Sequence, residues 1–81
     1  MKKEEIVEKV NSFLVDEFEL ESDQLLSDAL LKEDLDIESL DFVDIAVIIE
    51  KEFGIKVTSE QMIRLVKLED LYTFIQEQSE N

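Results

Sequence analysis

Apolar residues recur at helical spacing in two long segments of the chain. Across residues 3–18 they fall three or four positions apart, which predicts an amphipathic helix. Across residues 39–53 the apolar stripe is wider, and Gly54 follows it at a position typical of a helix C-cap. The second helix should therefore be the more buried or the more widely contacted of the two. The stripe residues are Ile6, Val7, Val10, Phe13, Leu14 and Phe18 in the first segment, and Leu40, Val43, Ile45, Ala46, Val47, Ile48, Ile49 and Phe53 in the second.

Two shorter helices are predicted after Gly54. Residues 58–61, Thr-Ser-Glu-Gln, match a capping box and should open a short helix that runs through Val66, with Met62 and Leu65 facing inward. A last helix of about ten residues is predicted from the helical spacing that starts at Leu68. Its inward positions are Leu68, Leu71, Tyr72 and Ile75. The polar residues 76–81 are expected to fray.

A long connection, residues 19–38, separates the first two helices. Its apolar residues are spaced irregularly, which predicts a loop that leucines hold onto the core, with a helical turn near residues 23–26. These residues are Leu20, Leu25, Leu26, Leu30, Leu31, Leu35 and Ile37. The pattern as a whole predicts an all-α fold: a small four-helix bundle, with three longer helices, a short third helix and a long first loop, in a single domain that spans residues 1–81.

Composition narrows the chemistry that such a bundle can perform. The 81 residues include no Cys and no His, which excludes disulfides, zinc fingers, thiolate nucleophiles and Ser-His-Asp triads. Residues 16–50 contain 13 acidic residues and one basic residue, Lys32, so this segment carries −12 of the net charge of −14. That charge disfavours binding to nucleic acid or to an anionic membrane, and it favours partners with basic surfaces. With no signal-peptide or membrane-span pattern, we expect a soluble cytoplasmic monomer.

The densest acidic stretch, residues 33–41, offers few routes to catalysis or metal binding. As a calcium loop it lacks the required glycine at the sixth position, which is Ser39, and the bidentate Glu at the twelfth, which is Ile45. Paired carboxylates that act as general acid and base need a sheltered cleft, which a domain of this size rarely offers. We therefore predict a protein that is not an enzyme, with no catalytic residue and no metal site.

Ser39 occupies the predicted start of the second helix. Free backbone N–H groups at a helix start favour a bound or attached phosphate. From the residues alone, the favoured interpretation of Ser39 is a helix N-cap, because no group in this chain could activate its hydroxyl. Any chemistry at Ser39 has to be performed by another protein.

Two segments of the sequence resemble an acyl carrier protein: residues 34–43, which contain the Ser39 motif, and residues 49–57, with the spacing Glu-x-x-Phe-x-x-x-Val. The predicted order of helices and the long leucine-rich loop resemble that family too. The resemblance implies that a phosphopantetheinyl transferase attaches 4′-phosphopantetheine from coenzyme A to Ser39. It also implies that the chain carries acyl groups as thioesters for acyl-processing enzymes of fatty-acid or polyketide-type biosynthesis. A chain without Cys needs the thiol of such an arm to form a thioester.

The resemblance further implies that the helix led by Ser39 docks on basic patches of partner enzymes. The residues it assigns to docking are Glu38, Leu40, Asp41, Asp44, Val47 and Glu50. Four other positions of this helix match the core of the family, and we expect them to be buried. They are Val43, Ala46, Ile49 and Phe53.

Several residues depart from the family pattern. Glu38 replaces the usual Asp before the serine, which keeps the carboxylate but adds one methylene, and Lys51 replaces a usual acid in the docking helix. Further departures are Asp36, Thr58 and Arg64. They make a specialised carrier, of polyketide or of amino-acyl or peptidyl type, as plausible as a housekeeping fatty-acid carrier. Two other classes stay open: an acidic interaction protein that mimics nucleic acid without a prosthetic group, and a metal-ion buffer.

Overall fold

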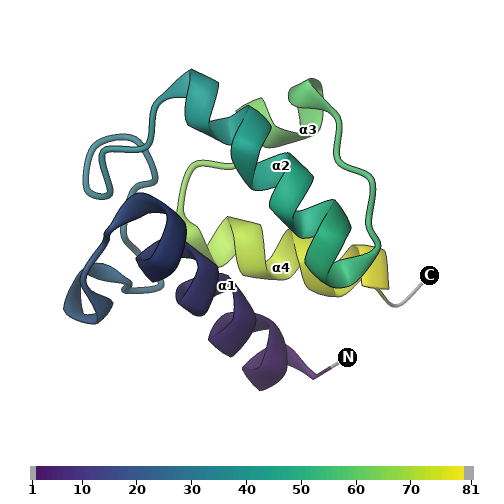
Figure 1. Cartoon of the computed structure of the whole chain (residues 1–81), viewed down its shortest axis with the longest axis horizontal. Coiled ribbons are helices and arrows are strands. Elements are labelled where there is room, and N and C mark those ends of the chain that lie inside the picture. Colours follow the sequence, from purple (N-terminus) through teal and green to yellow (C-terminus); the bar gives the residue numbers. More distant parts are fainter. Residues whose placement is uncertain (1, 80–81) are drawn as a thin grey trace.

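The computed structural model describes residues 2–79, in which four α-helices and one 3₁₀ turn follow one another (Figure 1). The elements are α1 (Lys3–Phe18), η1 (Ser22–Gln24), α2 (Ser39–Phe53), α3 (Ser59–Ile63) and α4 (Leu68–Ser79). The predicted all-α bundle, with a long first loop and a short third helix, is confirmed. Both longer predicted helices have the predicted bounds, and Gly54 ends α2 in a left-handed conformation (φ 68°).

The two C-terminal helices differ from the prediction at their ends. α3 stops at Ile63 and does not reach Val66, because the Asp70 carboxylate accepts hydrogen bonds from the amides of Val66 and Lys67, at 3.2 and 3.0 Å. Those amides immediately precede α4 and are held to its first turn. α4 in turn continues through residues 76–79, which were expected to fray. The rest of that predicted frayed segment, residues 80–81, lies outside the described residues.

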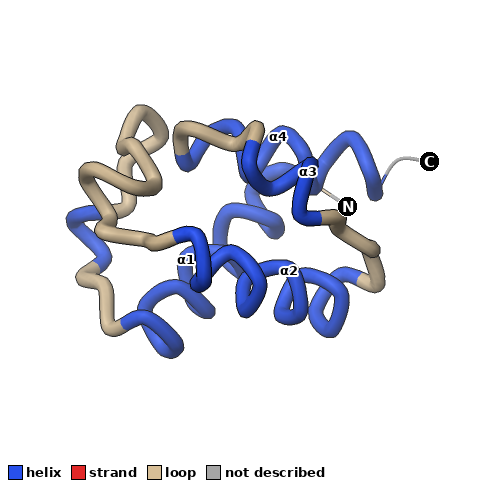
Figure 2. Tube along the Cα trace, turned by 90° about the horizontal axis from the view of Figure 1, so that it is seen from above, coloured by secondary structure: helices blue, strands red, loops and turns tan. Residues whose placement is uncertain are grey.

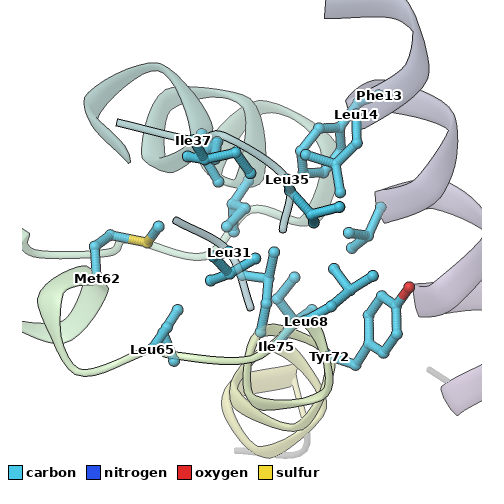
Figure 3. Packing of buried hydrophobic residues seen from close by; sticks show 14 of the residues in the cluster. Phe13, Leu14, Leu31, Leu35, Ile37, Met62, Leu65, Leu68, Tyr72 and Ile75 are labelled. Carbon is cyan, nitrogen blue, oxygen red and sulfur yellow. The ribbon is translucent and has the colours of Figure 1, made fainter. Parts of the chain in front are cut away.

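One cluster of apolar side chains forms the core (Figure 3). α1 packs against α4, and α2 packs against α3. Met62 and Leu65 face inward as predicted, at 1% and 8% exposure. One polar pair joins α1 to α4: the Tyr72 hydroxyl donates a hydrogen bond to Asn11 Oδ1, and burial raises the pKa of Tyr72.

The long loop is held against the bundle as predicted, with its helical turn at η1. Leu31, Leu35 and Ile37 are buried, whereas Leu26 is 59% exposed and does not contribute to the core. Backbone bonds tie residues 27–31 to residues 66–69, where α4 begins, including Leu31 N–H to the Val66 carbonyl at 2.9 Å. Figures 1 and 2 show the loop at the end of the bundle where α2 begins. The loop therefore positions the start of α2.

α2 has two apolar faces, and this corrects the predicted core. Val43 was expected to be buried and is 60% exposed, whereas Phe42, which the predicted stripe omitted, is 4% exposed. The buried face consists of Phe42, Ile45 and Ile49. Spacings of three and four residues place these on one side of a helix, and Val43 lies one residue off that line. Of the other expected core positions, Ile49 is fully buried, and Ala46 and Phe53 are half-buried.

Candidate functional site

Ser39 is the first helical residue of α2, and its side chain is exposed. The interpretation of Ser39 as an N-cap is wrong, because the residue with extended backbone at the cap position is Glu38 (φ −90°, ψ 166°). The Glu38 amide is satisfied from within the helix by Asp41 Oδ2, at 3.0 Å. In the part of the chain that the structure describes, the Ser39 hydroxyl makes no hydrogen bond. Its oxygen is therefore available to an incoming group.

An apolar groove between α2 and α3 opens beside Ser39, with a volume of about 330 Å³. Its lining residues are Ser39, Phe42, Val43, Ala46, Val47, Glu50, Val57, Ser59, Met62 and Ile63. Val43 and Ile63 are 60% and 66% exposed, so apolar surface continues from the groove to the outside. Such a site suits an apolar group that is attached or bound next to Ser39.

The α3 side of this groove was missed by the sequence analysis. Met62 was expected to face the core, and it does, but Ile63 and Val57 were given no role although they line the groove. The capping box at Thr58 contained the missing signal. It fixes the start of α3 through mutual bonds between Thr58 and Gln61, at 2.9 and 3.2 Å. The helical rotation of about 100° per residue then turns Ile63 away from the direction of the buried Met62.

The residues assigned to docking share the outer side of α2. Leu40 and Val47 are 80% and 60% exposed. Glu38, Asp44 and Glu50 are exposed too, and within residues 2–79 none of these three carboxylates is in an ion pair. Asp41 differs, since it is half-buried and bonded to the Glu38 amide. The helix thus combines exposed apolar side chains with uncompensated negative charge.

The acidic stretch before α2 serves the backbone of the loop. Asp34 Oδ2 accepts a hydrogen bond from the Leu30 amide at 2.9 Å, and Asp36 adopts a left-handed conformation (φ 55°). Among the described residues, no three acidic side chains form a group that could hold a metal ion. No helix in the same range is long and apolar enough to cross a membrane.

A model of the phosphopantetheine attachment site family matches residues 8–75, a span that includes Ser39, both walls of the groove and most of α4. The chain belongs to this family of carrier proteins. Its cofactor is 4′-phosphopantetheine, which the family binds covalently. Carriers of this family are not themselves catalytic, and they interact with modifying and acyl-processing enzymes. The comparison with curated proteins found no match.

The residues near Ser39 fit the cofactor of the family. A serine that forms a phosphodiester must expose its hydroxyl, and Ser39 does so on the first turn of a helix, where free amides tolerate negative charge. The neighbouring groove offers apolar walls to a cargo. The absence of Cys means that the carrier chain has no thiol of its own. The prosthetic arm therefore supplies a function that the side chains lack.

Proposed function

We propose that Ser39 is the attachment residue of the carrier and that the attached arm holds acyl intermediates of fatty-acid or polyketide-type biosynthesis. The observation that supports this most directly is the position of Ser39: an exposed, unbonded hydroxyl at the start of α2, beside an apolar groove. When bound, the arm supplies the thiol that forms the thioester. Ser39 holds the arm, and the groove residues shield an apolar cargo from water.

The apolar lining favours an acyl cargo over an amino-acyl or peptidyl cargo. Of the ten lining residues, Ser39, Glu50 and Ser59 are polar, and Glu50 is the one charged residue. A charged amino group would lose hydration on entering the groove, which costs free energy, and the carboxylate of Glu50 is exposed to water and offers it only a screened partner. A hydrocarbon chain instead gains about 25 cal/mol for each Å² of apolar surface that it buries.

Attachment is tested by intact-mass spectrometry after incubation with coenzyme A, magnesium and a broad-specificity phosphopantetheinyl transferase. We expect the wild type to gain one phosphopantetheine unit and Ser39→Ala to gain none. Ser59→Ala is the matched control, because Ser59 is the first residue of α3, as Ser39 is of α2, and lines the same groove. Modification of Ser39→Ala, or loss of modification in Ser59→Ala alone, would contradict the assignment.

We further propose that the outer side of α2 docks on the basic patches of partner enzymes. The docking surface consists of Glu38, Leu40, Asp44, Val47 and Glu50, with Asp41 on the first turn. Leu40→Ala should lower kcat/KM for the transferase by about fivefold, since an exposed apolar side chain in a docking core contributes on the order of 1 kcal/mol. The control is Val15→Ala, which shortens an exposed apolar side chain of α1 and should leave kcat/KM unchanged. Equal effects of the two substitutions would place the docking surface elsewhere.

A further inference from the structure

The turn that carries Ser39 is closed by two hydrogen bonds between its neighbours. The Glu38 amide donates to Asp41 Oδ2 at 3.0 Å, and the Asp41 amide donates to the Glu38 carbonyl at 2.9 Å. Both bonds span Ser39, which lies inside the ring that they close. The first bond uses a side chain, so substitution of Asp41 removes it and leaves the second in place.

The backbone is anchored by burial on each side of this ring. Ile37 is 2% exposed, and its amide donates to the Leu31 carbonyl at 3.0 Å. Phe42 is 4% exposed. Between these anchors, residues 38–40 are exposed and Asp41 is half-buried. The Asp41 side chain therefore restrains a stretch of chain that packing does not hold.

We propose that Asp41 is a positioning residue for the modification of Ser39 and acts through the Glu38 amide, in addition to its place on the docking surface. The proposal rests on the proposed attachment at Ser39. A charge that serves docking alone faces the partner, whereas Oδ2 of Asp41 is bonded back to the start of its own helix. Asp44, one turn further along α2, is exposed and accepts no hydrogen bond from the described residues, as expected of a docking charge.

The transfer reaction depends on where the serine oxygen lies. Ser39 Oγ forms a bond to the β-phosphorus of coenzyme A, the bond from that phosphorus to the diphosphate bridging oxygen breaks, and adenosine 3′,5′-bisphosphate leaves. The hydroxyl proton passes to a base of the transferase. The carrier contributes the position of Oγ, and attack requires the reacting atoms to be aligned at roughly 3–3.5 Å. A loosened turn should therefore lower kcat more than it raises KM.

Isosteric substitution separates the two roles of a carboxylate. Asp41→Asn removes the charge but keeps an oxygen that accepts the Glu38 hydrogen bond, whereas Asp41→Ala removes both. With the transferase, coenzyme A and magnesium, we expect Asp41→Ala to lower kcat on the order of tenfold and Asp41→Asn to keep the wild-type kcat. Asp44→Asn, which removes one exposed charge, should raise KM at unchanged kcat.

A bond of the same type elsewhere provides the control for general destabilisation. In η1 the Glu21 amide donates to Gln24 Oε1 at 2.8 Å, outside the proposed docking surface. Gln24→Ala should leave both kinetic constants unchanged. The proposal is overturned if Asp41→Asn loses as much kcat as Asp41→Ala, because the charge is then what matters. It is also overturned if Asp41→Ala keeps the wild-type kcat.

Amide hydrogen exchange in the unmodified carrier measures how firmly Asp41 holds the Glu38 amide, and it needs no transferase. The Glu38 amide should be protected in wild type and in Asp41→Asn, and should exchange about tenfold faster in Asp41→Ala. If wild type gains no phosphopantetheine, the proposed attachment fails while the exchange rates still test the restraint. If wild type is modified but the Glu38 amide exchanges equally in all three proteins, the positioning role of Asp41 alone fails.

Discussion

α1 and α2 are nearly equal in length, at 16 and 15 residues, but they differ in where they place their apolar side chains. α1 directs one face inward, and among its large hydrophobic residues Val15 is the exposed one, at 36%. α2 directs one face inward and a second outward. Its outer apolar residues are Leu40, Val43 and Val47, with 80%, 60% and 60% exposure.

The difference separates a helix that serves the fold from a helix that, in the proposed docking role, also serves recognition. An apolar side chain left in water contributes little to stability, so packing does not explain the outer face of α2. Apolar side chains grouped on a surface and bordered by charge are typical of an interaction site. The ends of the helices differ as well, since α1 ends at Glu19 in a left-handed conformation and α2 ends at Gly54, which adopts it without steric cost.

The largest expected effect contrasts the two faces of α2. Ile49→Ala should lower the free energy of unfolding by about 2–5 kcal/mol, because Ile49 is fully buried and leaves a cavity. Val47→Ala should change it by less than about 0.5 kcal/mol, because Val47 is 60% exposed. Urea denaturation of both variants measures the difference. Similar losses would mean that α2 does not have separate structural and recognition faces.

The second prediction concerns the side-chain hydrogen bond that joins Asn11 of α1 to Tyr72 of α4, since α2 makes no bond of this kind within the described residues. Tyr72→Phe leaves Asn11 without the hydroxyl donor and should cost on the order of 1 kcal/mol. Burial raises the pKa of Tyr72, so the folded state holds this proton more tightly than the unfolded chain, in which the pKa is about 10. The stability that the protonated Tyr72 hydroxyl contributes is therefore complete below about pH 10 and is lost as the pH rises through the folded-state pKa.

This alkaline loss can be isolated because the chain contains one tyrosine. Urea denaturation between neutral and alkaline pH should show a steeper loss of stability in wild type than in Tyr72→Phe. Phenolate absorbance should report a folded-state pKa above the usual value. Parallel pH profiles of the two proteins would show that Tyr72 does not contribute to the pH dependence.

The third prediction compares the ends of α1 and α2. Gly54→Ala should destabilise the fold by about 1 kcal/mol through its positive φ alone, since a Cβ at this position meets no atom within 4 Å. Glu19→Gly should instead stabilise it, by roughly 0.5–1 kcal/mol, because Glu19 has a φ of 56°. Thermal unfolding should show a lower melting temperature for Gly54→Ala and a higher one for Glu19→Gly than for wild type. A destabilising Glu19→Gly would show that chain entropy outweighs the relief of backbone strain.

The smallest effect expected is that of salt on the acidic start of α2. Glu38, Asp41 and Asp44 follow one another at intervals of three residues, so their carboxylates repel one another. Screening of this repulsion by NaCl or magnesium should raise the melting temperature by a few degrees, worth about 0.5 kcal/mol. Asp44→Asn should reduce this response. Glu5→Gln in α1, where Lys2 and Lys9 lie three and four residues away, should leave it nearly unchanged. A flat salt response in wild type would show that the repulsion is negligible.

The sequence by itself determined the helices and the candidate serine. Periodicity set the bounds of α1 and α2, the capping box set the start of α3, and the irregular leucines indicated a loop held to the core, because these features depend on neighbours in the chain. The motif around Ser39 indicated a phosphopantetheine carrier before any geometry was known. Residue type and spacing were sufficient for these conclusions.

Tertiary structure decided which face of each helix is covered and which group satisfies each backbone amide. Val43 was placed in the core and Phe42 was overlooked, because a wide apolar stripe does not specify which side its neighbours cover. Ser39 was taken for the cap, although Glu38 occupies that position and Asp41 satisfies its amide. The path of the loop sets where α2 begins, and packing against α3 sets which apolar residues stay in water. Both depend on residues distant in sequence, which local patterns do not contain.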